Sequence, residues 1–153
     1  MKIAVGSDHA GFGLKEDLQA YLVEQKVEVV DLGAYSEEPV DYPDIGGGVA
    51  GKVSRGEVER GLLICGSGIG MSIVANRFPG VRAALCHDLY TARMSREHND
   101  ANLLVLGGRL IGQDLGREIL KTWLEADFKG GRHQRRLEKI TALEEKIIRN
   151  DAK

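Results

Sequence analysis

The sequence predicts a three-layer α/β/α sandwich, Rossmann-like, in which a five-stranded and mostly parallel sheet lies between helices and a further helix ends the chain. Three observations predict it. Short apolar runs alternate with helical segments along the 153 residues, as in a parallel sheet with helices on both faces. The run over 61–66 is continuously apolar, as in a strand covered on both sides. No linker or internal repeat interrupts the chain, so residues 1–153 are expected to form a single domain.

The elements of the first half follow in order from local patterns. The run over 2–6 is short, apolar and β-branched, which predicts a strand that ends at a polar loop. From Leu14 the apolar residues recur every three or four positions, which predicts an amphipathic helix to about residue 25. The run over 27–33 predicts a second strand that ends on a glycine. Pro43 suits the first turn of a helix over 43–54, because the amide that proline lacks would be unpaired there.

The second half repeats the alternation of strands and helices. The remaining strands are expected over 61–66, 81–86 and 102–108, and further helices over 69–77, 88–98 and 113–126. A last helix is expected from about 132 to 148, and its apolar face consists of Leu137, Ile140, Leu143 and Ile147. The sequence leaves open whether that face packs on its own subunit or on a partner. The charged tail over 149–153 is expected to fray.

Composition and charge narrow the function classes. The formal net charge is −2, which gives no general attraction to nucleic acid or to an anionic membrane, so a bound anion needs a local basic cluster. The 2 cysteines, Cys65 and Cys86, are too few for a disulfide framework or a four-cysteine zinc site. We expect no signal peptide, because Lys2 is followed at once by a strand, and no apolar run approaches a membrane span. These features predict a cytoplasmic protein with reduced thiols.

Four loops at one edge of the predicted sheet carry the polar residues of interest. Parallel strands end at the same edge, and ligands of such sheets bind there. The loops after the first, third, fourth and fifth strands therefore face one cleft, and they begin with SDHAG, CGSGIG, CHD and GGR. In the first loop, Asp8 suits a helix cap and His9 an ordinary loop position. As polar groups at the end of a core strand, both are also candidate ligand contacts.

The loop from Gly66 to Gly70 follows the third strand and precedes a helix. Its glycines do not give the dinucleotide fingerprint G-x-G-x-x-G, and it lacks the G-K-[ST] ending of a P-loop. A tight strand-to-helix turn explains the spacing nearly as well as a binding role does. The position favours binding, since a glycine turn at a helix N-terminus offers backbone amides to an anion or a developing oxyanion.

Cys65 stands immediately before this loop. A lone cysteine is most often a small buried hydrophobic residue. At the mouth of the cleft, however, the positive end of the following helix would favour its thiolate. Met71 stands where a Cys-x5-Arg phosphatase loop has its arginine, and no C-x-x-C pair is present, which excludes a phosphatase loop and a redox pair. Among functional roles, a base or a nucleophile remains.

Two further groups of residues are candidates for substrate chemistry. His98 and Asn99 lie where the fourth predicted helix gives way to the fifth strand. A histidine suits a helix C-terminus as a cation, but beside Asn99 and a cleft His98 is also a candidate general acid. Arg132 and Arg136 are four apart at the start of the last helix, so they form either a phosphate clamp or a solvated basic face. Arg109, after a Gly–Gly pair, is a third candidate phosphate contact.

In this order, the segments GSDHAG, DYPD, CGSGIGMSIVANR, REHNDANLLVLGGR and GGRHQRR resemble the ribose-5-phosphate isomerase B family and its relatives that isomerise galactose 6-phosphate and allose 6-phosphate. The resemblance extends from Met1 to about Ile147. It implies an aldose–ketose isomerase that acts on a small sugar phosphate and needs neither metal nor cofactor. It also implies a homodimer or homotetramer with active sites at the subunit interface.

The resemblance implies roles for individual residues. Cys65 matches the base that moves a proton between carbons 1 and 2 of the sugar, and His98 matches the acid that helps to open the furanose ring. Ser67 lies in the loop that stabilises the enediolate, where many members have threonine. The implied substrate contacts are Asp8, His9, Tyr42, Gly66, Ser67, Gly68, Ile69, Gly70, Asn99, Arg109, Arg132 and Arg136. One branch uses a glutamate base at the position of Met71 and lacks the cysteine, so this chain resembles the cysteine branch.

Interconversion of ribose 5-phosphate and ribulose 5-phosphate through an enediolate is the leading expectation. The alternatives are a six-carbon sugar phosphate as substrate, a non-catalytic sugar-phosphate or nucleotide-binding module, and a thiol redox protein. Intact Cys65 and His98 weigh against a module without catalysis, and the spacing of Cys65 and Cys86 does not support a redox pair. The sequence does not decide between a dimer and a tetramer. It also does not decide whether His98 serves its own site or the neighbour's, although the resemblance implies the neighbour's.

Overall fold

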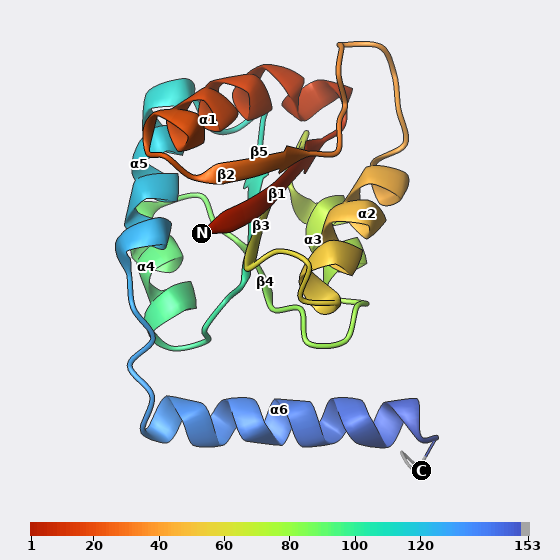
Figure 1. Cartoon of the computed structure of the whole chain (residues 1–153), viewed down its shortest axis with the longest axis vertical. Helices are drawn as coiled ribbons and strands as arrows, with labels where there is room; N and C mark the ends of the chain where they lie inside the picture. Colours follow the sequence, from red (N-terminus) through yellow and green to blue (C-terminus); the bar gives the residue numbers. More distant parts are fainter. Residues whose placement is uncertain (151–153) are drawn as a thin grey trace.

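The computed structural model describes residues 1–150 and contains a five-stranded sheet between helices (Figure 1). The strands are β1 Lys2–Ser7, β2 Glu28–Asp31, β3 Arg60–Cys65, β4 Ala83–Leu85 and β5 Leu103–Gly107. They lie in the order β2-β1-β3-β5-β4, and each neighbouring pair is parallel. The predicted sandwich is confirmed, and its sheet is parallel throughout.

Helices cover both faces of the sheet. On one face lie α1 Phe12–Glu24, α4 Leu89–Glu97 and α5 Gln113–Glu125, whose apolar side chains form one buried cluster with the strands. On the other face lie α2 Tyr42–Ser54 and α3 Ile69–Ala75, which form a second cluster. The central strands β3 and β5 are buried almost throughout, as a strand covered on both sides must be. None of the helices within residues 1–150 has the length and apolar character needed to cross a bilayer.

Three local features differ from the prediction. The strand expected over 81–86 spans only Ala83–Leu85, and the one expected over 27–33 spans only Glu28–Asp31. Both lie at sheet edges, where the backbone finds a ladder partner on one side only. A short 3₁₀ turn, η1 His9–Gly11, precedes α1 and was not predicted. It forms because the Asp8 side chain accepts a hydrogen bond from the Gly11 amide at 3.1 Å.

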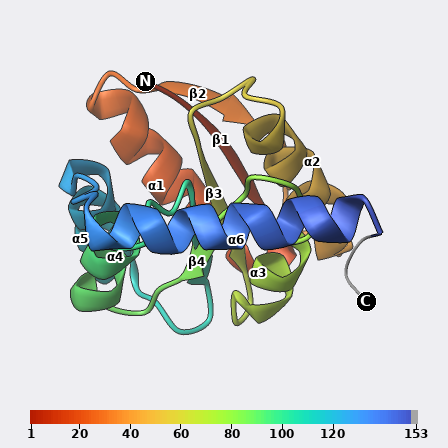
Figure 2. The same cartoon turned by 90° about the horizontal axis from the view of Figure 1, so that it is seen from below.

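The last helix, α6 Arg132–Ile148, crosses below the sandwich from the side of α4 and α5 to the side of α2 and α3 (Figures 1 and 2). A groove lies between it and residues that flank the starts of β4 and β5, so it lies at the amino edge of the sheet. Leu137 is buried, whereas the other apolar residues of the helix are exposed, namely Ile140, Leu143, Ile147 and Ile148. Within the chain, therefore, only the first part of this helix packs on the body, and most of its apolar face is uncovered. Residues 151–153 of the predicted frayed tail lie outside the described residues.

Candidate active site

Cys65 is the last residue of β3 and leads into the glycine loop. Two backbone hydrogen bonds tie this junction to the end of β5. The Gly108 amide donates to the Cys65 carbonyl at 2.8 Å, and the Arg109 amide donates to the Gly66 carbonyl at 3.0 Å. Cys65 is 5% exposed and packs in the core cluster of α2 and α3. The thiol is therefore held by central strands at the carboxyl edge of the sheet, where the sequence placed the cleft.

Gly68 allows the sharp turn from β3 into α3. Its φ of 79° lies in the left-handed region, and a Cβ there would lie 3.0 Å from the carbonyl oxygen of Leu106. A side chain at this position would therefore be strained. Beside it, Ser67 Oγ accepts a hydrogen bond from the Ile69 amide at 3.3 Å. A glycine turn is thus a structural requirement here, and it leaves the loop amides at the N-terminus of α3.

Tyr42 and Arg109 lie directly against the loop. A Cβ at Gly70 would lie 2.6 Å from Cζ of Tyr42, so the phenol ring covers this glycine. A Cβ at Gly66 would lie 3.1 Å from Nη1 of Arg109, so the guanidinium covers that one. The structure therefore brings a phenol and a cation to the loop beside Cys65.

Asp8 and His9 reach the same edge of the sheet from the end of β1. The Asp8 amide donates to the Ile64 carbonyl at 3.1 Å, which places this segment next to the residue before Cys65. Asp8 is buried, and its carboxylate caps η1, so it has the structural role that the sequence allowed. Nδ1 of His9 accepts a hydrogen bond from the Val40 amide at 3.3 Å. In the neutral ring the proton therefore lies on Nε2, which can donate to a ligand.

His98 and Asn99 lie at the opposite edge of the sheet. His98 caps the C-terminus of α4, and its amide donates to the Met94 carbonyl at 2.9 Å. The Asn99 carbonyl accepts from Nε of Arg82, the residue before β4, at 3.1 Å. Since β3 has 6 residues, the two edges of the sheet lie about 16 Å apart. A single chain therefore does not bring His98 to Cys65.

Arg132 and Arg136 join this second group through the start of α6. Both are exposed, and between them His133 is buried. The rings of His98 and His133 are stacked, with centroids 4.2 Å apart and an interplanar angle of 9°. The stack connects the end of α4 to the first turn of α6. It places the candidate acid and the two candidate phosphate ligands at the same edge.

His133 is a residue of the candidate site that the sequence analysis missed. The GGRHQRR segment drew attention to its arginines, and the histidine between them received no role. A signal was present, because His133 and Leu137 are four residues apart and both are buried. This spacing identifies the face on which α6 contacts the body.

The pKa of His133 is lowered, first by burial and then by the positive charges of His98, Arg132, Arg136 and Lys129. The unfolded chain therefore takes up a proton near the ordinary histidine value of about 6.5 before the folded chain does. The stability that His133 contributes is fully present above that pH and is lost as the pH falls through the lowered folded value.

His133→Phe keeps a ring in the stack and removes this titration. We expect the wild-type chain to lose more free energy of unfolding than the variant between about pH 7.5 and pH 5.5. Urea unfolding at both pH values measures the difference. Equal losses would show that His133 is not linked to stability in this way.

Cys86 lies in the core cluster of α1, α4 and α5, on the other face of the sheet from Cys65. Both thiols are free. Burial raises the pKa of the Cys86 thiol, and hydrogen bonds with Thr91 and Ser95 oppose this shift only in part. The sheet therefore separates the two cysteines, which weighs against the redox alternative.

The candidate residues form two groups within one chain. At the carboxyl edge lie Asp8, His9, Tyr42, Cys65, Gly66, Ser67, Gly68, Ile69, Gly70 and Arg109; at the amino edge lie His98, Asn99, Arg132 and Arg136. The first group combines a thiol with a glycine loop and a cation, which suits proton abstraction with development of negative charge. The second combines an imidazole with a basic cluster, which suits proton donation and phosphate binding. Across residues 1–150, no cluster of three or more His, Cys, Asp or Glu side chains is arranged to hold a metal ion.

Comparison with known proteins identifies close relatives. A sequence model described as Ribose/Galactose Isomerase matches residues 3–140. Ribose-5-phosphate isomerase B of Escherichia coli K12 is 51% identical over 145 residues, which cover 95% of this chain and 97% of that protein. The putative sugar phosphate isomerase YwlF of Bacillus subtilis is 50% identical over 149 residues, or 97% of this chain and 100% of YwlF.

A solved structure of ribose-5-phosphate isomerase B from Clostridium thermocellum superposes with a TM-score of 0.94 at 53% identity, and the match covers 96% of this chain and 99% of that one. Both the sequence and the fold therefore match over nearly their whole lengths. The chain belongs to the Ribose/Galactose Isomerase family.

Proposed function

We propose that this protein interconverts ribose 5-phosphate and ribulose 5-phosphate, with Cys65 as the base. The observation that carries the proposal is the junction of β3 with the glycine loop. There, a thiol stands at the carboxyl edge of the sheet beside loop amides, and Tyr42 and Arg109 lie against the loop. The close relatives named ribose-5-phosphate isomerase B support the choice of substrate.

The proposed chemistry moves one proton between two carbons. The thiolate of Cys65 removes the proton on carbon 2 of the open-chain aldose, and the electron pair forms the double bond of an enediolate. The loop from Gly66 to Gly70, with Ser67, stabilises the negative oxygen by hydrogen bonds that are strongest when the charge has developed. Cys65 then returns the proton to carbon 1, which gives the ketose. A base and its conjugate acid are regenerated without a change of oxidation state in the protein.

The proposal places the complete site between two subunits of a homodimer. Cys65 and His98 stand at opposite edges of one sheet, so a single chain cannot present both to a five-carbon sugar. In a two-fold dimer, the carboxyl edge of one subunit can face the amino edge of the other, which forms two equal sites. The exposed apolar residues of α6 support this proposal, because they need a covering surface.

In such a site, His98 of the partner subunit donates a proton to the ring oxygen and so helps to open the furanose. Arg132 and Arg136 bind the phosphate together with Arg109 and His9, while Asp8, Tyr42 and Asn99 contact the sugar. Phosphate binding by several cations holds a short substrate at the base and lowers the entropic cost of the reaction. Both thiols are free, which supports a reducing, cytoplasmic location.

The substrate class is tested by steady-state kinetics on ribose 5-phosphate, allose 6-phosphate and galactose 6-phosphate. We expect kcat/KM for ribose 5-phosphate to exceed the other two values by about tenfold or more, because one extra carbon between carbon 1 and the phosphate misplaces one end of the substrate. We also expect turnover to survive a chelator. A higher kcat/KM on a six-carbon substrate would replace the proposed substrate with that sugar phosphate.

A further inference from the structure

Lys15 of α1 carries a charge in the interior of the protein. Its side chain is 0% exposed, and Nζ lies 2.8 Å from both carboxylate oxygens of Asp31 at the end of β2. Nζ also lies 3.3 Å from Glu16 Oε1, and 5.6 Å and 5.4 Å from the ring centres of Phe12 and Tyr35. A buried ion pair recovers its desolvation cost only in part, and an apolar residue often stabilises a fold as well. Stability alone therefore does not explain this lysine.

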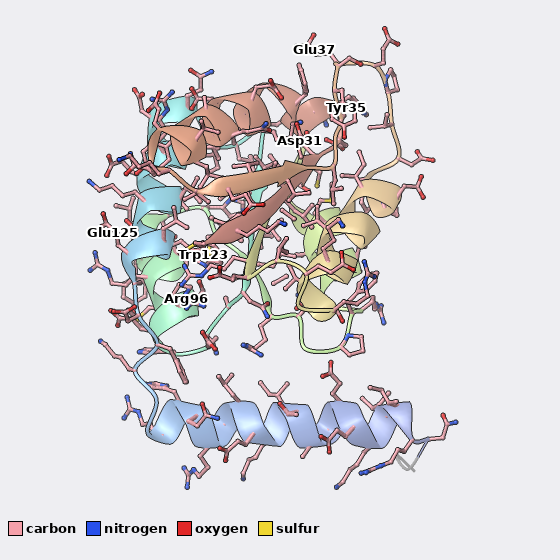
Figure 3. All side chains as sticks on the ribbon, in the orientation of Figure 1. Asp31, Tyr35, Glu37, Arg96, Trp123 and Glu125 are labelled. Carbon is pink, nitrogen blue, oxygen red and sulfur yellow. The ribbon has the colours of Figure 1, made fainter. Side chains whose placement is uncertain are left out.

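Asp31 extends the contact from Lys15 into the loop that connects β2 to α2. Its Oδ1 also accepts a hydrogen bond from the Gly33 amide at 2.9 Å. Its main-chain carbonyl accepts a hydrogen bond from the Tyr35 hydroxyl at 3.0 Å. Figure 3 shows Asp31 and Tyr35 close together where this loop leaves the sheet. The start of the loop is thus fixed on the buried ammonium group.

The same loop holds the segment that carries two of the proposed substrate contacts. The Ser7 amide donates to the Gly33 carbonyl at 2.6 Å, and the Ala34 amide donates to the Ser7 carbonyl at 2.7 Å. Both backbone groups of the residue before Asp8 are therefore paired with the loop. Farther along, the Val40 amide donates to Nδ1 of His9 at 3.3 Å. The loop over 31–41 contacts the segment 7–9 at two separate points.

We propose that Lys15 and Asp31 are positioning residues that hold Asp8 and His9 in place for the substrate through this loop. The inference rests on the proposed function, in which Asp8 and His9 contact the sugar phosphate. Neither Lys15 nor Asp31 touches the cleft in this account. Cys65 and its loop are held separately, by the hydrogen bonds from Gly108 and Arg109. Loss of the Lys15–Asp31 pair should therefore weaken substrate binding more than the chemical step.

The test compares Lys15→Met with Arg117→Met. Methionine removes the charge from Lys15 and keeps an unbranched side chain of similar length. Arg117 of α5 pairs with Asp17, which lies on the same helix as Lys15, and its Nε is 2.8 Å from Asp17 Oδ2. This pair has no contact with the loop over 31–41 among the hydrogen bonds of residues 1–150. The control variant therefore loses an ion pair of α1 without disturbing the loop.

We expect Lys15→Met to raise the KM for ribose 5-phosphate by about tenfold while kcat changes by less than about threefold. Arg117→Met should leave both values within about twofold of wild type. Tyr35→Phe removes the hydroxyl bond to Asp31 without leaving a buried charge, so it should fold normally and raise KM in the same direction by a smaller factor. Equal KM values in all variants that fold would overturn the proposal.

Hydrogen exchange gives a readout that does not depend on activity. The amides of Ser7 and Ala34 should exchange about tenfold faster in Lys15→Met than in Arg117→Met, because the loop that pairs with them is released. Unchanged exchange at both amides would contradict the positioning role. Faster exchange in a protein that turns over no sugar phosphate would support the positioning and would overturn the proposed function instead.

Discussion

Cys65→Ala is expected to lower kcat/KM for ribose 5-phosphate by about a thousandfold, which is the range of a lost general base. The variant removes the only group that the proposal allows to take the proton from carbon 2. The loop amides and the phosphate contacts remain, so KM should change much less than kcat. Steady-state kinetics measure this split. Exchange of the carbon 2 proton with deuterated solvent should fall in parallel, since it needs the same base.

Cys86→Ala is the matched control. It also removes a buried thiol, from the core cluster on the other face of the sheet, and leaves a small cavity there. We expect it to lower the free energy of unfolding by about 1 kcal/mol and to change kcat/KM by less than about twofold. A Cys65→Ala variant as active as Cys86→Ala would remove Cys65 from the mechanism.

The sequence predicted the elements well because hydrophobic periodicity reflects burial. The run over 61–66 became β3, which is covered on both faces, and the three- and four-residue spacing from Leu14 became α1. The predictions were least accurate where one contact decides the local structure. The edge strand β4 ends at Leu85, and η1 depends on a single bond from the Gly11 amide to Asp8. Such contacts leave little pattern in the sequence.

The chemistry of the site was visible in the sequence, but its division between two edges was not used. Strand order and connection rules place Cys65 after a strand and His98 before one, so the two residues belong to opposite edges of a parallel sheet. Motif resemblance joined them into one site without regard to this distance. Lys15 and His133 escaped notice for a different reason. Their roles come from burial and from a facing side chain, which only the folded structure provides.

The division between edges leads to a complementation experiment. Cys65→Ala and His98→Asn homodimers should each be nearly inactive, since every site lacks its base or its acid. In a heterodimer of the two chains, one site contains both defects and the other contains both wild-type side chains. Random pairing puts half of the subunits into heterodimers, so the mixture should recover about a quarter of wild-type kcat/KM per subunit. Coexpression of the two chains with different affinity tags, followed by kinetics, measures the recovery.

The control replaces His98→Asn with a chain that carries both substitutions. Its heterodimer with Cys65→Ala has no site with both wild-type side chains, so recovery should be absent even though the subunits assemble in the same way. If Cys65 and His98 acted within one chain, each site of the first heterodimer would keep one defect, and neither mixture would recover activity. Recovery in the first mixture alone requires a site shared between subunits, because no rearrangement of a single chain can unite side chains that two different polypeptides supply.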